Sequence, residues 1–279
     1  MKQYKEFIIK TTPYNPDLVS GFLWELNIIG LNESEDSLIV FAEEKSILTL
    51  EDVSNKLKIL IVNKVIDSFD VKEKLIEGKN WNEEWEKRIN VVEVSEHIVI
   101  KPSFKNYDNK QNKIVITIDP KMSFGTGEHE TTKLVIQLLE KYIKKGMRTL
   151  DVGMGTGILA IASIKLGAKY ALAIDNDEWS FENANENCRF NNVSKKVEIN
   201  LSEIEQVKEN NFDIILANIQ KNVLVDINKE IIKRLSKNGI TILSGLLIED
   251  ERDIVDKYKE LELIERETMG DWLALVFQK

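Results

Sequence analysis

The chain has 279 residues, of which 43% are hydrophobic and 30% are charged, and its formal net charge is -9 at pH 7. This size suits one large domain or two smaller ones, and the negative charge disfavours direct binding to nucleic acid. The single cysteine, Cys188, excludes a disulfide framework or a cysteine zinc site. The N-terminus has no signal-peptide pattern and no apolar run is long enough to span a bilayer, so we expect a cytoplasmic protein without membrane contact.

The first 78 residues have the pattern of a small α/β domain. Strands are predicted at residues 4–10, 37–41 and 65–71, and helices at 17–26 and 50–60. The order strand-helix-strand-helix-strand indicates a ferredoxin-like layer, with one further strand expected around residues 46–49. We therefore predict an N-terminal domain over residues 1–78.

A charged segment at residues 79–92 is predicted to be a connector helix. Its Trp81 and Trp85 are four residues apart, so they share one helix face. We interpret them as anchors of this helix on one of the domains rather than as ligand-stacking residues. A second domain is then expected over residues 93–279, beginning with strands at 97–101 and 113–119.

Strands and helices alternate from residue 131 onward. Helices are predicted at 131–144, 158–166, 178–190, 223–235 and 249–258, and strands at 148–152, 171–175, 196–200, 212–217, 240–244, 261–267 and 272–277. Alternation of this kind predicts a mostly parallel, doubly wound, Rossmann-like α/β sheet of seven strands. Only four residues join the last two strands, which leaves no room for a crossover helix, so these two strands must be antiparallel neighbours.

A glycine-rich loop, VGMGTGI at residues 152–158, joins the first of these strands to its helix. Ligands of doubly wound sheets bind where the strands end, and glycines let the backbone approach a ligand closely. Asp175 ends the next strand, where a carboxylate can accept two hydrogen bonds from a ribose diol. The loop therefore predicts a cofactor that contains a nucleoside.

Three features favour S-adenosyl-L-methionine over a nicotinamide dinucleotide. The glycine spacing is G-x-G-x-G, and Ile158 stands where the dinucleotide fingerprint G-x-G-x-x-G has its third glycine. Asp151 would oppose a pyrophosphate but suits a ligand that carries an ammonium and a sulfonium. The antiparallel closing hairpin is typical of the common methyltransferase fold. A nicotinamide dehydrogenase is therefore the least favoured interpretation.

Several motifs together closely resemble the bacterial PrmA family, the methyltransferases of ribosomal protein L11. They are DPKMSFGTGEHETT at residues 119–132, LDVGMGTGILAIASIKLGA at 150–168, LANI at 216–219, SGLL at 244–247 and GDWLALV at 270–276. The resemblance covers the chain well from residue 80 to the end, whereas the first 78 residues match only in layout. It implies a monomeric, S-adenosyl-L-methionine-dependent protein N-methyltransferase that modifies lysine side-chain or N-terminal amines of ribosomal protein L11.

The resemblance also implies site residues. Thr132, Gly153, Asp175 and Asn218 fall on the family's cofactor-contacting positions, and no metal is expected. The amide oxygen of Asn218 is the candidate acceptor for a hydrogen bond from the incoming amine, which makes Asn218 the candidate catalytic residue. Helix capping is the alternative role for the hydroxyl of Thr132.

Five further positions complete the candidate site. Phe124, Gly125 and Gly127 are expected to cover the cofactor, and Gly155 to contribute backbone from the loop. His129, one of two histidines, is placed at the edge of the site without a chemical role.

Two departures from the family pattern bear on the choice of substrate. The family usually has an apolar residue where Gln220 stands, and the domain that captures the protein substrate in the family is divergent here. Two other functions therefore stay open: methylation of another protein or of a small-molecule amine, and a catalytically silent protein that binds the ribosome.

Overall fold

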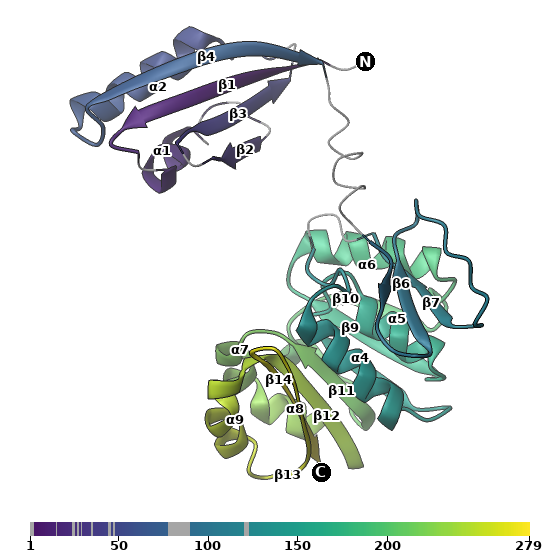
Figure 1. The fold of residues 1–279 in the computed structure, drawn as a ribbon. Helices are drawn as coiled ribbons and strands as arrows, with labels where there is room; N and C mark the ends of the chain where they lie inside the picture. The colour runs from purple at the N-terminus through teal and green to yellow at the C-terminus, as the bar shows by residue number, and fades with distance from the viewer. Residues whose placement is uncertain are drawn as a thin grey trace. The chain divides into compact units, whose positions relative to one another are not determined.

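The computed structural model describes residues 3–14, 16–23, 26, 28, 30–34, 36–43, 46, 48–77, 90–119 and 123–279. Internal contacts divide the chain into two compact units, Met1–Arg88 and Ile89–Lys279 (Figure 1). The predicted connector at 79–92 falls mostly outside the described residues, as do its Trp81 and Trp85. The two units are described separately below.

The first unit is a four-stranded antiparallel sheet in the order β2-β3-β1-β4. Its elements are β1 (Gln3–Thr12), α1 (Pro16–Leu23), β2 (Gly30–Glu33), β3 (Leu38–Glu43), α2 (Leu50–Val62) and β4 (Ser68–Glu77). Alternate residues of β1 and β3, such as Phe7 and Val40, are fully buried together with Val19 of α1 and Leu57 of α2. Both helices therefore pack on one face of the sheet, as the ferredoxin-like interpretation requires.

The fourth strand of this unit is not where the sequence pattern suggested. We expected it around residues 46–49, but it is β2, which forms a hairpin with β3. This edge strand, GLNE, is at best half-buried, so it lacks the apolar alternation that marks a strand in the sequence. Within residues 46–49, Leu48 is buried in the core and Thr49 caps α2.

The second unit begins with a three-stranded sheet and a helix. The strands are β5 (Val92–Glu93), β6 (Ile98–Lys101) and β7 (Ile114–Thr117), and the helix is α4 (Glu130–Tyr142). β6 and β7 are parallel, at the positions that the sequence predicts within a residue or two. This sheet leads directly into the segment that carries Phe124.

The described residues of the second unit then form a seven-stranded sheet in the order β10-β9-β8-β11-β12-β14-β13. The strands are β8 (Arg148–Val152), β9 (Tyr170–Asp175), β10 (Val197–Leu201), β11 (Phe212–Asn218), β12 (Leu235–Leu247), β13 (Glu262–Met269) and β14 (Trp272–Gln278). Strands β8 to β12 pair in parallel, whereas β14 runs antiparallel to both β12 and β13. The Rossmann-like fold and the closing antiparallel hairpin are confirmed.

Helices cover both faces of this sheet (Figure 1). They are α5 (Ile158–Lys165), α6 (Glu178–Phe190), α7 (Lys221–Asp226), α8 (Asn228–Arg234) and α9 (Glu251–Lys257). Ala171 and Ala173 of β9 pack in the core with α4, α5 and α6, while Leu172 and Ile174 pack in the core with α7, α8 and α9. The strands are apolar on both faces, as expected for parallel strands that are buried on both sides.

The single helix predicted at 223–235 is wrong in one respect, because it is broken into α7 and α8 at Ile227. The side chain of Asn228, at the start of α8, is buried and donates a hydrogen bond to Lys257 O at 3.1 Å. This bond ties the start of α8 to the end of α9, which is a tertiary contact that periodicity does not report. The break places Asp226 and Ile227 beside the site described next.

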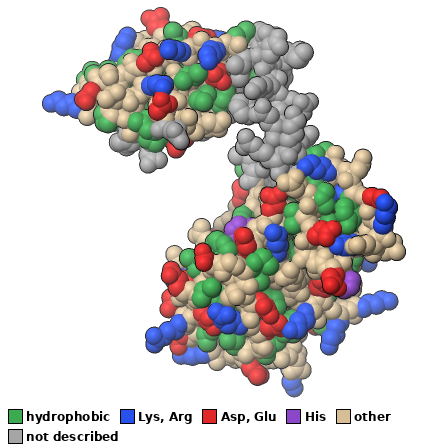
Figure 2. Space-filling model, in the orientation of Figure 1, with side chains coloured by type: hydrophobic (Ala, Val, Ile, Leu, Met, Phe, Trp, Pro, Cys, Tyr) green, Lys and Arg blue, Asp and Glu red, His purple; other side chains and the backbone are tan. Residues whose placement is uncertain are grey.

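No helix among the described residues has both the length and the apolar character of a bilayer span. The face shown in Figure 2 intersperses acidic and basic side chains in both units, so the described residues present no uniformly basic surface on that face.

Candidate active site

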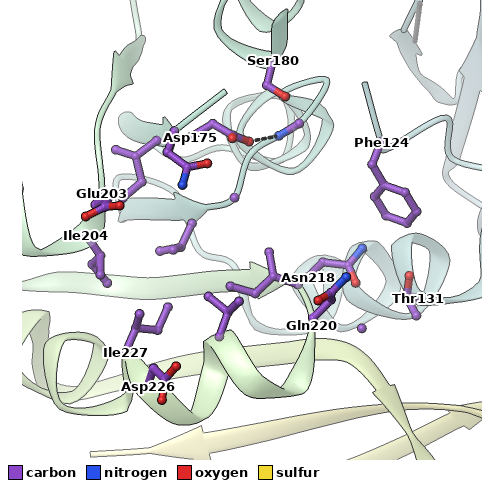
Figure 3. A pocket seen from close by; sticks show the side chains of 18 of the residues that line it. Phe124, Thr131, Asp175, Ser180, Glu203, Ile204, Asn218, Gln220, Asp226 and Ile227 are labelled. Carbon is purple, nitrogen blue, oxygen red and sulfur yellow. Dashed lines mark hydrogen bonds between the residues drawn. The ribbon is translucent and has the colours of Figure 1, made fainter. Parts of the chain in front are cut away.

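A pocket of about 740 Å³ opens at the carboxyl ends of β8, β9 and β11, a size typical of cofactor sites (Figure 3). Strand ends and the loops that follow them supply most of its lining. Among the lining residues are Phe124, His129, Thr131, Gly153, Gly155, Asp175, Asn176, Ser180, Ser202, Glu203, Ile204, Asn218, Gln220, Asp226, Ile227 and Trp272. The pocket therefore lies where the glycine loop and Asp175 predicted a ligand.

The glycine loop crosses the end of β9. Gly153 N and Met154 N both donate to Ile174 O at 3.0 Å. Gly153 has a φ of +72°, and a Cβ atom added there would lie 2.4 Å from the side chain of Ile219. A larger residue would be strained and would clash, so the loop keeps its backbone open to the pocket only with glycine at this position.

Asp175 ends β9 with its carboxylate at the pocket. Its Oδ2 accepts a hydrogen bond from Gly155 N at 2.9 Å (Figure 3). Its Oδ1 accepts one from Asp177 N at 3.1 Å. A carboxylate has about four lone-pair positions. Two backbone bonds therefore orient this carboxylate and still leave it able to accept hydrogen bonds from a ribose diol.

Asn218 ends β11 on the other side of the loop. Its Nδ2 donates to Thr132 Oγ1 at 3.4 Å, while its Oδ1 is buried without a hydrogen-bond partner among the described residues. A buried acceptor without a partner is costly, and its presence in a pocket indicates a ligand donor. Asn218 is therefore the residue of the site best placed to receive an N–H group.

Thr132 does not itself line the pocket. It is fully buried in the first turn of α4, one residue after Thr131, which does line the pocket. The N-cap of α4 is His129, whose side chain accepts a hydrogen bond from Thr131 N at 3.3 Å. Capping is thus the role of His129, and the hydroxyl of Thr132 acts on Asn218.

Aromatic rings form one rim of the pocket. The ring of His129 makes edge contacts with Phe124 at 5.5 Å and with Trp272 at 4.7 Å between centroids. Phe124 is 56% exposed and lines the pocket. Gly125 and Gly127 do not line it; they lie against Thr156 and Ile100, respectively, and leave no room for a side chain there.

The loop after β10 supplies residues that our interpretation of the sequence missed. Ser202, Glu203 and Ile204 line the pocket opposite the glycine loop. They directly follow a predicted strand, so the rule that ligands bind at strand ends could have identified them. Trp272 was missed for another reason, since β14 reaches the pocket only through its pairing with β12.

The pocket is acidic. Its lining includes Asp175, Glu203, Glu205 and Asp226 but no lysine or arginine among the described residues. Carboxylates in a partly enclosed site favour cationic ligands over phosphates. The described residues contain no cluster of three or more histidine, cysteine, aspartate or glutamate side chains that could hold a metal.

Asp151 lies behind the glycine loop rather than in the pocket. It is buried, its Oδ2 accepts a hydrogen bond from Ala160 N at 3.1 Å, and its Oδ1 has no partner among the described residues. Burial raises the pKa of Asp151 to about 7, and the nearby charge of Asp175 adds to this rise. Any attraction of Asp151 for a cationic ligand therefore acts through the loop and not by direct contact.

Comparisons with known proteins identify the family of this chain. The family described as “Ribosomal protein L11 methyltransferase (PrmA)” matches residues 26–279. A ribosomal protein L11 methyltransferase from Caldicellulosiruptor bescii is 32% identical over 304 aligned positions, which cover 99% of both chains. One from Acetivibrio thermocellus is 38% identical over 205 positions, or 73% of this chain and 65% of that relative, which is less than two thirds of its length.

A solved structure is also similar to this chain. The ribosomal protein L11 methylase from Lactobacillus delbrueckii subsp. bulgaricus superposes with a TM-score of 0.63 at 30% sequence identity, covering 67% of this chain and 97% of that one. The family match spans most of the chain, and the relative from Caldicellulosiruptor bescii aligns over nearly all of it. The chain therefore belongs to the PrmA family of ribosomal protein L11 methyltransferases.

Proposed function

We propose that this protein methylates amines of ribosomal protein L11 with S-adenosyl-L-methionine as the methyl donor. The substrate is the one that the names of its relatives state. The observation that carries the proposal is the buried Oδ1 of Asn218, which has no partner among the described residues and lies in a pocket with the glycine loop and Asp175. An acceptor at this position suits an amine.

The residues present fit this cofactor. The loop at Gly153 and Gly155 leaves backbone exposed to the pocket, the carboxylate of Asp175 would hold the ribose, and Ser202 and Ile204 would border the base. The acidic lining suits a ligand with an ammonium and a sulfonium. When bound, the cofactor supplies an electrophilic methyl group, and the protein's part is to orient the amine and to exclude water.

Within this function, we propose lysine side-chain amines as acceptors, together with the N-terminal amine. A lysine ammonium has a pKa near 10.4 in water, so it must lose a proton before it can attack. The acidic pocket attracts the cation, while the neutral amide of Asn218 binds the amine without stabilising its charged form as a carboxylate would. Asn218 therefore orients a nucleophile that is free to lose its proton.

We assign capture of the protein substrate to the N-terminal unit. It has a hydrophobic core of its own, and none of its residues lines the described pocket. A methyltransferase of small molecules has no need of such a separate domain. A catalytically silent ribosome-binding protein is disfavoured because Gly153, Asp175 and Asn218 line one pocket, as binding of the cofactor would require.

Mass spectrometry of purified ribosomal protein L11, incubated with this protein and S-adenosyl-L-methionine, tests the proposal. We expect the mass to rise in methyl-sized steps, with fragments that place the methyl groups on lysine or N-terminal amines. The matched control is Asn218→Ala under the same conditions. An unchanged mass, with cofactor binding verified in the same sample, would reject L11 as the substrate and leave the cofactor assignment standing.

A further inference from the structure

Thr156, in the middle of the glycine loop, is fully buried and does not line the pocket. Its N–H donates to Phe124 O at 3.0 Å, and its Oγ1 donates to Gly125 O at 2.8 Å. Its own carbonyl oxygen accepts a hydrogen bond from Asn187 Nδ2 at 3.0 Å. One residue thus ties the loop that approaches the cofactor to the backbone that carries Phe124 and to helix α6.

Asn187 extends this connection to Asp119, at the end of the segment that follows β7. Its Oδ1 accepts a hydrogen bond from Asp119 N at 3.0 Å, and its Nδ2 also lies 3.4 Å from Asp119 O. Asn183, one turn earlier on α6, donates to the same Asp119 O at 2.8 Å. On the other side, Ser103 N donates to the Asp119 carboxylate at 2.7 Å. Asp119 is therefore held by both its backbone and its side chain.

The glycine loop and the segment that carries Phe124 are tightly packed against each other. A Cβ atom on Gly155 would lie 2.4 Å from Phe124 O, and one on Gly125 would lie 2.6 Å from Thr156 Oγ1. Close-packed backbones move together, because any relative shift breaks hydrogen bonds or creates a clash. A displacement of the loop at Gly155 is therefore transmitted to Phe124.

We propose that Thr156 and Asn187 are positioning residues through which the cofactor loop sets the place of Phe124 at the pocket rim. The ring of Phe124 contacts His129, which caps α4. The same helix holds Thr132, which accepts the hydrogen bond from Asn218. The aromatic rim and Asn218 are therefore both connected to the start of α4. Ligand binding at Gly153 and Gly155 then orders the rim where the acceptor amine enters. The identity of that ligand rests on the function proposed above.

Hydrogen exchange followed by mass spectrometry tests the connection without measuring activity. Amide exchange over residues 123–129 is compared with and without S-adenosyl-L-methionine in the wild type, Thr156→Val and Thr156→Ser. We expect the cofactor to slow exchange in the wild type and in Thr156→Ser, which keeps the hydroxyl. In Thr156→Val, loss of one buried hydrogen bond should speed exchange roughly fivefold and remove the response to cofactor.

Kinetics and a second pair of variants separate positioning from general stability. For Thr156→Val we expect kcat to fall roughly fivefold while the Kd of the cofactor changes little, with recovery in Thr156→Ser. Asn187→Ala should behave like Thr156→Val. The matched control is Asn185→Ala on the same helix, since Asn185 donates to Phe181 O one turn earlier on that helix.

Two results would overturn the proposal: a cofactor response over residues 123–129 that persists in Thr156→Val, or an Asn187→Ala variant that exchanges like Asn185→Ala. A wild type that shows no cofactor response over this segment would overturn it as well. The hydrogen-exchange result does not depend on which protein is the substrate. Suppose that the wild type left L11 unmodified, that its exchange responded to the cofactor, and that Thr156→Val showed no such response. The positioning role would then stand and the proposed substrate would fail.

Discussion

Thr132 Oγ1 accepts a hydrogen bond from Asn218 Nδ2 at 3.4 Å, so a buried helix residue orients the amide of a strand-end residue. This bond uses one of the two hydrogens of Nδ2, and Oδ1 has no hydrogen-bond partner among the described residues. Asn218 therefore offers a hydrogen-bond acceptor at the pocket, and Thr132, which orients its amide, lies behind it. This arrangement leads to the first prediction.

Asn218→Ala should lower kcat on the order of tenfold to a hundredfold while the Kd of S-adenosyl-L-methionine changes less than threefold, about 0.7 kcal/mol. The physical reason is that the variant loses the acceptor that orients the amine but keeps the loop and Asp175. Calorimetry and steady-state kinetics with L11 provide the two numbers. Asn222→Ala, an exposed position on α7, is the matched control. Equal losses in kcat and in cofactor affinity would move Asn218 to cofactor binding.

Asp175→Ala should weaken cofactor binding by roughly tenfold to a hundredfold, since hydrogen bonds to a charged group contribute about 1.5–3 kcal/mol. The variant loses the ribose acceptor and also releases Gly155 N. Isothermal titration of S-adenosyl-L-methionine measures the effect. Asp177→Ala, two residues later, removes the N-cap of α6 and should cost about 1 kcal/mol of stability with an unchanged Kd. Unchanged affinity in Asp175→Ala would remove the ribose assignment.

Gly155→Ala should abolish cofactor binding and destabilise the fold more than Gly270→Ala does. Both glycines have similar left-handed backbones, with φ of +51° and +58°, so each alanine costs about 1–2 kcal/mol of conformational strain. Only at Gly155 would the new Cβ meet another atom, Phe124 O at 2.4 Å, whereas nothing lies within 4 Å at Gly270. Chemical denaturation of both variants measures the difference. Equal losses of stability would mean that the loop tolerates a side chain.

Asp151→Asn should change how stability depends on pH. Burial raises the pKa of Asp151 to about 7, above its value near 4 in the unfolded chain, so the folded protein holds the proton more tightly. Its contribution is therefore full below pH 4 and is lost as the pH rises through 7. The free energy of unfolding of the wild type, relative to Asp151→Asn, should fall between pH 5 and 8. Urea denaturation across that range gives the two curves, and parallel curves would contradict the raised pKa.

Local pattern was sufficient for most elements of the second unit. The strand at Arg148–Val152 and the helix at Glu178–Phe190 were predicted to the residue from their apolar pattern, and the structure shows that Asp177 caps the helix. The antiparallel closing hairpin followed from the length of one loop. The same pattern missed β2, whose edge position leaves little apolar signal, and the break at Ile227, which a contact with α9 accompanies.

In the candidate site, too, some residues could be predicted from the sequence and others could not. Gly153 and Asp175 could be chosen from the sequence because each stands at the end of a predicted strand, and parallel strands in one sheet bring such ends together. Asn218 was chosen through the resemblance of its motif, LANI, to the PrmA family. Tertiary structure alone decided that Thr132 acts behind Asn218 and that Thr156 joins the loop to Phe124. These roles depend on hydrogen bonds between segments 31 to 86 residues apart. Periodicity reports which face of an element is buried, but the atom that each buried polar group meets is set by how the elements pack.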